Sequence, residues 1–372
     1  MPSRKFSKRE RVTVNASEAD LSPDKELEII TKFFWFSGIA FYPFDTFLSL
    51  KGFLVTCLDV GVSVLSIYFL AATVHFTATL SSHATGHAFI STFANIIGLC
   101  IRFIVLKKRR RIRKCSEIIS KLNQDMMLAP DTKRTRRFLW IACGLSVLLP
   151  VSMMVFSLIT DDTACDILAS NQRLAVEMSP LLTMILCVFV FTRLRDINRN
   201  FLAQLQSSMD MNMPTKLFTD YTKLYGRITK TVEKVEKTFS LISFFLYGYM
   251  LSCVFSITSY MITRLPGSSY ASGILFQAAT FIEIVACFIF LSIRAANVNE
   301  SAVEVKNLIH SLPAKRFDFN PNLTATLLQL ANNFASEVCV TGWGLFMINR
   351  GFILTTAGVV VTYGVILVQL GS

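Results

Sequence analysis

Three acidic residues lie inside long apolar runs of the sequence, where a charged side chain is costly to place in lipid. They are Asp59, Glu177 and Glu283, and Glu283 falls at the centre of its run. Such a residue is expected to face the interior of a helix bundle or a water-filled cavity. Two interpretations stay open for Glu283: contact with a ligand or an ion, and a structural hydrogen bond to a neighbouring helix.

The last apolar run carries a stripe of polar and small residues. Thr355, Gly358, Thr362, Ile366 and Gln369 recur at spacings of three and four residues, which places them on one face of a helix, and every member but Ile366 is polar or small. A polar stripe on a spanning helix either packs against another helix or lines water. Gln369 stands at the outer end of this run, where we expect an aqueous mouth. The pattern favours a pore-lining helix, with close helix packing as the alternative.

The histidines and other reactive residues form no motif for catalysis. His75, His83 and His87 cluster on one side of the predicted membrane, and His310 stands alone. A zinc site among the first three is one interpretation, and ordinary polar residues at a membrane interface are the commoner one. Motifs of metalloproteases, serine hydrolases and nucleotide-binding folds are missing from the sequence. We predict a protein that is not an enzyme and has no cofactor or metal.

Apolar runs define the class of protein that positions these residues. The chain has 372 residues, 52% of them hydrophobic, and a mean hydropathy of +0.50. The runs are about 20 residues long, enough for a helix to cross about 30 Å of hydrocarbon. We predict an all-α polytopic membrane protein with seven transmembrane helices. The predicted spans are Gly52–Val74, Gly86–Leu106, Phe138–Ile159, Leu174–Thr192, Ser240–Ile262, Gly273–Ile293 and Phe352–Leu370.

The distribution of Lys and Arg predicts the orientation. With the N-terminus in the cytoplasm, inner segments hold 34 of the 37 basic residues, and the outer loops hold only Arg173 and Arg264. Cytoplasmic loops are enriched in Lys and Arg, so we predict a cytoplasmic N-terminus and an extracellular C-terminus. The net charge of +12 then reflects basic loops and not a nucleic-acid partner. Lys107–Lys114 follows a span directly and is interpreted as a stop to translocation, with contact to anionic lipid as an option.

The spans divide the chain into six segments. These are a cytoplasmic N-terminal segment with an interfacial helix at Phe33–Phe44 (1–51), transmembrane helices 1–4 (52–192), a cytoplasmic helical loop (193–239), transmembrane helices 5–6 (240–293), a cytoplasmic anchor segment (294–351) and the pore helix (352–372). Apolar residues at helical spacing predict that spans four to seven extend into the cytoplasm as a bundle, with loose loops as the alternative. The sequons at Asn15, Asn299 and Asn322 fall on the inner side and are expected to carry no glycan.

A signature stands at the end of the chain. Thr362-Tyr363, five mostly apolar residues and then Gln369-Leu370 resemble the Thr-Tyr…Gln-Phe terminus of the insect gustatory receptors. Upstream, Gly344, Phe346 and Asn349 resemble that family's Gly-x-Phe-x-x-Asn stretch. The motif resemblance covers residues 327–370, and the remainder matches in architecture.

The resemblance implies a tastant-gated, non-selective cation channel in the plasma membrane of taste neurons, related to the insect odorant receptors. Four gustatory receptor subunits, identical or different, would surround one pore lined by their last helices. The cytoplasmic helices would hold the subunits together. The implied pore and gate residues are Thr362, Ile366, Gln369 and Leu370. Thr355 is added to them because it belongs to the polar stripe. Tyr363 is implied to brace the helix against its neighbours.

Two residues depart from the family pattern. Leu370 replaces the usual Phe, which leaves an apolar residue at the pore mouth but puts the gate geometry in question. Gly364 stands where sugar-sensing members often have an acidic residue. Gly364 therefore favours a bitter or divergent member of the family over a sugar receptor.

The ligand pocket is chosen by depth and not by motif. Ligand sites are apolar, aromatic clefts with a few placed polar groups, so we select outer-half polar and aromatic residues among helices 2–6. The predicted pocket residues are Thr92, Asn95, Phe156, Glu177, Tyr260, Gln277, Thr280 and Glu283. Ordinary helix packing is the alternative for each of them.

Two other classes of membrane protein compete with the channel. A G-protein-coupled-type receptor also has seven spans, but its outer N-terminus would leave 34 basic residues outside, against the charge rule. A secondary transporter is expected to show paired, broken helices in two halves. Pro150, Pro180 and Gly358 interrupt spans individually and form no such pair.

Overall fold

The structure is a computed structural model. It describes residues 25–36, 39, 82–126, 139–145, 164–209, 215–264, 271–315 and 339–371, with isolated positions between 61 and 75 and at 137 and 148. The predicted spans Gly52–Val74 and Phe138–Ile159 fall largely outside these residues. Side chains near several helix ends also lie outside the description.

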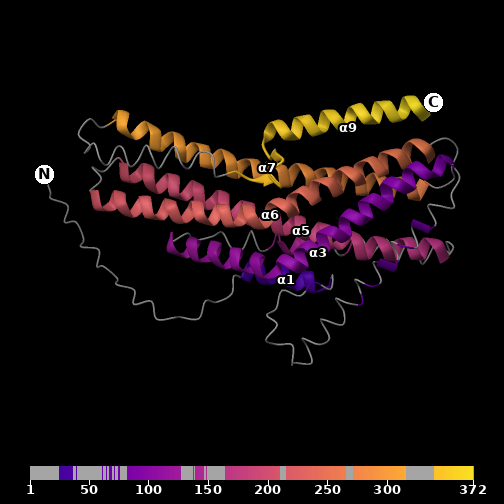
Figure 1. The fold of residues 1–372 in the computed structure, drawn as a ribbon, viewed down its shortest axis with the longest axis horizontal. Coiled ribbons are helices and arrows are strands. Elements are labelled where there is room, and N and C mark those ends of the chain that lie inside the picture. Colours follow the sequence, from indigo (N-terminus) through magenta and orange to yellow (C-terminus); the bar gives the residue numbers. More distant parts are fainter. Residues whose placement is uncertain are drawn as a thin grey trace, which may run out of the picture.

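Long helices dominate the described chain (Figure 1). They are α1 (Lys25–Phe36), α3 (Ser82–Asp125), α5 (Ala164–Met209), α6 (Thr215–Arg264), α7 (Ala271–Lys315) and α9 (Arg350–Gly371), and β1 (Thr341–Gly342) and β2 (Phe346–Met347) form a small hairpin before α9. Within the described residues, four helices are long and apolar enough to cross a membrane. Those stretches are Phe89–Asp125, Met178–Ser207, Asp220–Ser259 and Gln277–Leu308, with Arg350–Ile366 as a shorter apolar helix. The prediction of an all-α, multi-span membrane protein is confirmed.

Four of the helices are far longer than a membrane requires. α3, α5, α6 and α7 contain 44, 46, 50 and 45 residues. At 1.5 Å per residue, the length of each is about twice the thickness of the hydrocarbon. Each helix therefore has an apolar half and a half that continues beyond it. We call the continuing parts, residues 107–125, 193–209, 215–239 and 294–315, the distal bundle.

Polar contacts fix how the long helices are paired. Lys108 Nζ of α3 donates to the Thr238 carbonyl of α6 at 2.8 Å, and further along Arg227 of α6 forms an ion pair with Asp125 of α3. These two helices therefore run antiparallel over the distal bundle. Asn198 Nδ2 of α5 donates to Ser301 Oγ of α7 at 3.1 Å.

The distal bundle has a packed interior of its own. Phe201 of α5 and Tyr225 of α6 are buried, and their rings stack with centroids 5.2 Å apart. At the edge of the bundle Phe239 is fully buried and meets Phe191, in the apolar half of α5, edge to face. Aromatic pairs of this kind contribute about 0.5–1.5 kcal/mol beyond the area they bury. This part of the chain therefore has a packed core.

The predicted interfacial helix Phe33–Phe44 falls mostly outside the described residues, and the described N-terminal helix overlaps only its start. The observed α1 begins at Lys25 and ends at Phe36. Ile30 and Phe34 are fully buried against the other helices, and Glu26 is buried in an ion pair with Arg193 of α5. The first turn of α1 is polar and precedes the apolar residues from which the helix was predicted, and the ion pair with Arg193 attaches this turn to the bundle.

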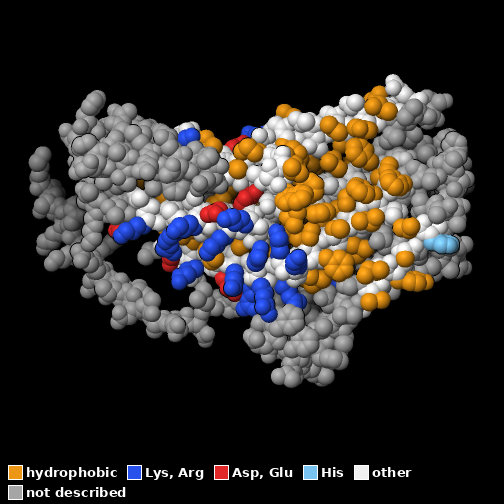
Figure 2. Space-filling model, in the orientation of Figure 1, with side chains coloured by type: hydrophobic (Ala, Val, Ile, Leu, Met, Phe, Trp, Pro, Cys, Tyr) orange, Lys and Arg blue, Asp and Glu red, His pale blue; other side chains and the backbone are white. Residues whose placement is uncertain are grey.

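The surface divides into two chemical zones (Figure 2). Exposed apolar side chains cover one end of the molecule in this view, and Lys and Arg gather beside them over the distal bundle. Phe89 and Leu354 are 68% and 76% exposed, an arrangement that water would disfavour and lipid tails would favour. The exposed apolar zone marks the part of the molecule that meets the membrane interior.

Candidate pore helix and its hairpin support

A hairpin turn with left-handed backbone precedes α9. Trp343 and Gly344 have φ angles of 53° and 71°, and the Leu345 N–H donates to the Gly342 carbonyl at 3.0 Å. Positive φ at both central residues is the requirement of type I′ hairpin turns. Gly344 meets it without steric cost, whereas Trp343 is strained in this region. The first glycine of the signature therefore shapes the turn.

Gly342 lies directly opposite Phe346 in the hairpin. A Cβ atom built on Gly342 would overlap the Phe346 ring. The aromatic ring therefore occupies the space that any other residue at position 342 would need. Phe346, the second residue of the upstream signature, is thus held over the backbone of its partner strand.

The hairpin is attached to α6 by backbone and side-chain hydrogen bonds. The Trp343 N–H donates to the Ser240 carbonyl at 3.1 Å. The carboxylate of Glu236 accepts from the Thr341 hydroxyl and from the Thr341 N–H, the latter at 3.1 Å to Oε2. Glu236 lies just before the apolar segment that begins at Ser240. Burial raises the pKa of its carboxyl, and the two hydrogen bonds from Thr341 partly oppose that rise.

Asn299 attaches the hairpin to α7. Its Oδ1 accepts from the Val340 N–H at 2.8 Å, and its Nδ2 donates to the Ile348 carbonyl at 2.9 Å. One side-chain amide therefore joins the two residues that flank the hairpin, whose own backbones also pair. This amide is the acceptor group of one predicted sequon, and here it serves an internal contact.

The start of α9 is fixed by a cap and an ion pair. Asn349 Oδ1 accepts from the Phe352 N–H at 2.8 Å, so the signature asparagine is the N-cap residue that satisfies a free donor of the first turn. Arg350, the next residue, pairs with Glu300 of α7 at 2.7 Å. The last helix therefore begins at a defined point on α7.

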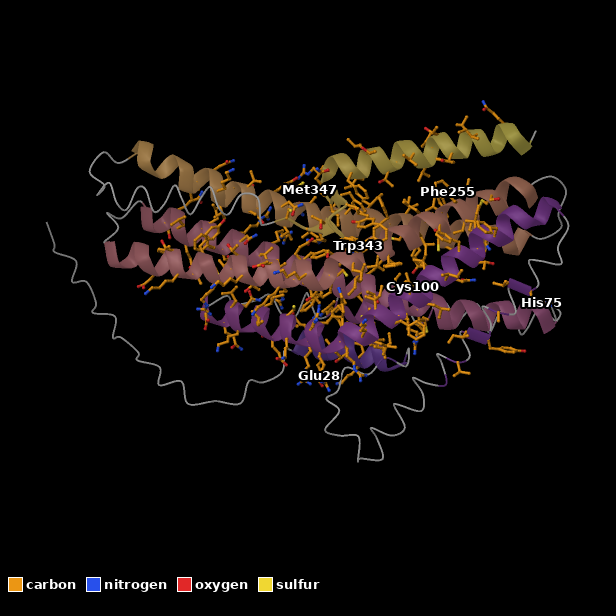
Figure 3. All side chains as sticks on the ribbon, viewed as in Figure 1. Glu28, His75, Cys100, Phe255, Trp343 and Met347 are labelled. Atoms are coloured by element: carbon orange, nitrogen blue, oxygen red, sulfur yellow. The ribbon has the colours of Figure 1, made fainter. Side chains whose placement is uncertain are left out.

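Aromatic rings fill the corner between the hairpin, α6, α7 and α9. Phe346 and Phe352 stack with centroids 4.7 Å apart, and Tyr247 of α6 meets both rings edge to face. Tyr247 also shares a 2.9 Å hydrogen bond with Ser292 of α7. The Trp343 ring packs on the Phe244 ring, with centroids 5.5 Å apart. Figure 3 places Trp343 and Met347 at this corner, where α9 departs from the bundle.

One face of α9 packs on the bundle. Thr356 is buried, and Phe352 and Val360 pack against the core. Tyr363 meets Phe255 of α6 edge to face at 5.4 Å. Residues 352, 356, 360 and 363 repeat at helical spacing, so these contacts form a single stripe on α9 that faces α6 and α7.

The predicted pore stripe lies on the other side of α9. Its members are exposed in the single chain: Thr355, Gly358, Thr362, Ile366 and Gln369. The hydroxyls of Thr355 and Thr362 donate to the carbonyls of Gly351 and Gly358, one turn back, at 3.0 and 2.8 Å. The Leu370 side chain lies outside the described residues. The subunit itself therefore leaves the polar face uncovered.

The predicted pocket residues occupy several helices. Thr92 is buried and Asn95 half-buried on α3, one turn apart, and Gln277, Thr280 and Glu283 lie buried or half-buried on α7. Phe156 and the side chains of Glu177 and Tyr260 lie outside the described residues. α3 and α7 both pack on α5 and α6, so the two groups share neighbouring helices.

Thr280 differs from the other described members of this set. Its hydroxyl oxygen is buried without a hydrogen-bond partner among the described groups. A buried hydroxyl normally finds a partner, so this position is open to a polar group of a ligand. Among the described residues, no group of three His, Cys, Asp or Glu side chains is placed to hold a metal ion.

The fold and the last helix define a multi-span helical membrane protein with an uncovered polar helix face. A family model described as 7tm Chemosensory receptor matches residues 27–372. Because the match extends over nearly the whole chain, the chain belongs to this family, which is one of receptors and not of enzymes.

Individual relatives agree with this assignment. The gustatory receptor 5a for trehalose of Drosophila melanogaster is 26% identical over 173 residues, or 45% of this chain and 37% of that relative, so the match spans well under two thirds of its length. Two structures of the insect olfactory receptor OR5 from Machilis hrabei, one in complex with eugenol, superpose with a TM-score of 0.74 at 13% identity. They cover 94% and 93% of this chain, and 98% of each receptor chain. The resemblance to insect gustatory receptors is confirmed, and the likeness to the olfactory receptor shows the fold.

Sequence reasoning missed the hairpin that supports the last helix. The signature residues Gly344, Phe346 and Asn349 pointed to this segment, but their roles in a turn, a ring stack and a helix cap came only from the structure. Gly342 and Gly344, two residues apart before a helix, were the local signal for the turn. Asn299 and Glu236 carry no such signal, because their partners lie 41 and 105 residues away.

Proposed function

We propose that the protein is a tastant-gated, non-selective cation channel in the plasma membrane of taste neurons. Four subunits surround one pore, and each contributes α9 to its wall. The subunits are copies of this chain or other gustatory receptor chains. The N-terminus lies in the cytoplasm and the C-terminus outside, as the distribution of basic residues predicts.

The single observation that carries this proposal is the uncovered polar face of α9. Phe352, Thr356 and Val360 hold the helix on its own subunit, which leaves Thr362 and Gln369 exposed. A spanning helix places polar residues against other helices or against water. When four α9 helices surround one axis, their polar faces lie against neighbouring helices at the sides and against water in the central pore.

The hairpin supports a route from ligand to pore. Asn299 and Glu236 tie it to α7 and α6, and the Phe346–Phe352 stack ties it to α9. A ligand that shifts α6 or α7 therefore moves the start of α9. We place that ligand, a small-molecule tastant, among helices 2–6 in the half of the bundle away from the distal bundle, with Thr280 and Glu283 in contact with it.

The distal bundle supports assembly. Its core is packed, and its cations lie on the side assigned to the cytoplasm. We propose that this part of each subunit holds the four chains together while the outer halves move.

Expression in a cell without other taste receptors, with a tastant panel and voltage-clamp recording, tests the proposal. The expected result is a current that reverses near 0 mV in sodium and potassium solutions and appears within milliseconds, independent of G proteins. A response that disappears when G-protein signalling is blocked, or substrate uptake without current, would replace the channel with one of the two rival classes. A protease site on the N-terminus cleaved from outside intact cells would contradict the orientation.

A further inference from the structure

One face of α3 changes from apolar to basic within a single turn. Its exposed apolar residues are Phe89, Phe93, Ile96 and Phe103, and its exposed basic residues are Lys107, Arg110, Arg111 and Lys114. Both sets recur at spacings of three, four and seven residues, so they share one face of the helix. The side of α3 that meets lipid tails therefore continues directly into a side that carries four cations.

α6 extends this basic face. The contacts of Lys108 with Thr238 and of Cys115 with the Lys234 carbonyl show that α3 and α6 run side by side and antiparallel here. Lys230, Lys234 and Lys237 are exposed on α6 at helical spacing. Figure 2 shows the resulting group of basic side chains next to the edge of the apolar zone. We call these seven residues the basic face.

Acidic residues balance the basic face only in part. Arg113 and Lys237 pair with Glu117 and Glu233 on their own helices. Within the described residues, no ion pair involves Lys107, Arg111 or Lys114. The mutual repulsion of clustered cations is unfavourable, and it is visible at Lys108, whose pKa is lowered by burial and then by the charge of Arg111.

Several other cations near this depth have acidic partners. Arg193 pairs with Glu26, Arg195 with Asp196, and Arg350 with Glu300. Orientation alone requires basic residues on one side of the membrane, and paired cations satisfy that rule equally well. Lys107, Arg111 and Lys114, for which no ion pair occurs among the described residues, stand where a face of α3 leaves the lipid tails.

We propose that the basic face is a binding site for an anionic phospholipid of the adjoining leaflet, with a headgroup that carries more than one phosphate. The acyl chains lie along Phe93, Ile96 and Phe103, and the headgroup reaches Arg111, Lys114 and Lys234. Clusters of four to eight basic residues next to a spanning helix are typical of such recognition. The bound lipid offsets the repulsion between α3 and α6 cations and so stabilises the junction of the membrane helices with the distal bundle.

Native mass spectrometry of the purified full-length receptor, titrated with dioctanoyl phosphatidylinositol 4,5-bisphosphate, tests this site. Each cation near an anionic surface contributes about 1 kcal/mol, or about fivefold in affinity. We therefore expect the double variant Arg111→Gln, Lys114→Gln to bind the lipid roughly 20-fold more weakly than the unaltered receptor. Lys230→Gln with Lys234→Gln, on the other helix, is expected to have a similar effect.

The control is Lys121→Gln with Lys223→Gln, which removes the same charge from exposed positions of the same two helices. These positions lie about 10 Å or more further from the apolar zone than the basic-face residues do. The affinity for the lipid is therefore expected to stay within about twofold of that of the unaltered receptor. Equal weakening by the control and the basic-face variants would overturn the proposal. So would binding of dioctanoyl phosphatidylcholine with the same affinity.

A competition arm separates a lipid from a soluble phosphate. Free inositol 1,4,5-trisphosphate is expected to displace the lipid only at a large excess, because it lacks the chains that contact α3. Displacement at equal concentration would overturn the assignment to a lipid. The melting temperature of each variant without added lipid verifies folding, and Arg111→Lys with Lys114→Arg, which keeps the charge, is expected to restore binding.

Discussion

The rings of Phe346 and Phe352 stack in parallel, with centroids 4.7 Å apart and planes inclined by 4°. One ring belongs to the second strand of the hairpin and the other to the first turn of α9. Stacked rings resist sliding and tilting because both motions expose apolar area. The hairpin and the base of α9 are therefore expected to move as one body, which makes the hairpin the point where the rest of the subunit acts on the last helix.

Replacing Gly342 by Ala tests the importance of the hairpin. The added methyl group overlaps the Phe346 ring, and overpacking of this kind destabilises by about 1–3 kcal/mol. We expect a lower melting temperature of the purified receptor and loss of ligand-evoked current at unchanged surface expression.

Gly226→Ala is the matched control for this variant. Gly226 lies inside α6, and a Cβ there meets nothing within 4 Å. Alanine is favoured over glycine within a helix by about 1 kcal/mol, so this variant is expected to melt at the same or a higher temperature. Equal effects of the two substitutions would show that the hairpin has no special role.

Asn299→Ala is expected to weaken the connection between α7 and the hairpin. The substitution removes both hydrogen bonds, to Val340 and to Ile348, and leaving partly buried partners unsatisfied costs about 1–3 kcal/mol. Current evoked by a given ligand concentration is expected to fall, while ligand binding to the purified receptor persists. Asn307→Ala, at an exposed position of the same helix, is expected to behave like the unaltered receptor. A parallel loss of binding and current in Asn299→Ala would point to general misfolding.

The contact between Glu236 and Thr341 is expected to depend on pH. Burial raises the pKa of the Glu236 carboxyl above its ordinary value of 4.5, so the folded state binds this proton more tightly than the unfolded state. The resulting stability is present at pH values below 4.5 and is lost as pH rises through the raised pKa. Glu236→Gln cannot titrate, so its melting temperature is expected to fall less over this range than that of the unaltered receptor. Identical pH profiles would exclude Glu236 as the titrating group.

Patterns within single helices were readable from the sequence. Unbroken apolar runs gave the membrane class, and the spacing of Thr355, Thr362 and Gln369 gave a face of α9 that the structure leaves exposed. The periodicity after Thr192 predicted helical segments next to the spans, and α5 and α6 do continue past their apolar parts. Each of these predictions depends only on the spacing of residues within a single helix.

Contacts between distant residues were not readable in this way. The hairpin depends on Asn299 and Glu236, which are separated from it by long stretches of chain. α1 begins eight residues earlier than the predicted helix. Its first turn is attached to the bundle by the ion pair of Glu26 with Arg193, and because these residues are 167 positions apart, no local pattern indicates the contact. The ligand pocket has the same difficulty, since its residues come from several helices and no local pattern selects among them.

The central claim is that the face of α9 with Thr362 lines the pore. Thr362 and Val361 are adjacent, both exposed in the single chain, and about 100° apart around the helix, so they differ in direction and hardly in depth. The direct measurement is ligand-evoked current from Thr362→Cys and Val361→Cys receptors treated from outside with a charged, membrane-impermeant thiol reagent. Irreversible block of Thr362→Cys, with Val361→Cys and the unaltered receptor unaffected, is the predicted result. Block of Val361→Cys alone, or equal insensitivity of both variants, would contradict the assignment of this face to the pore.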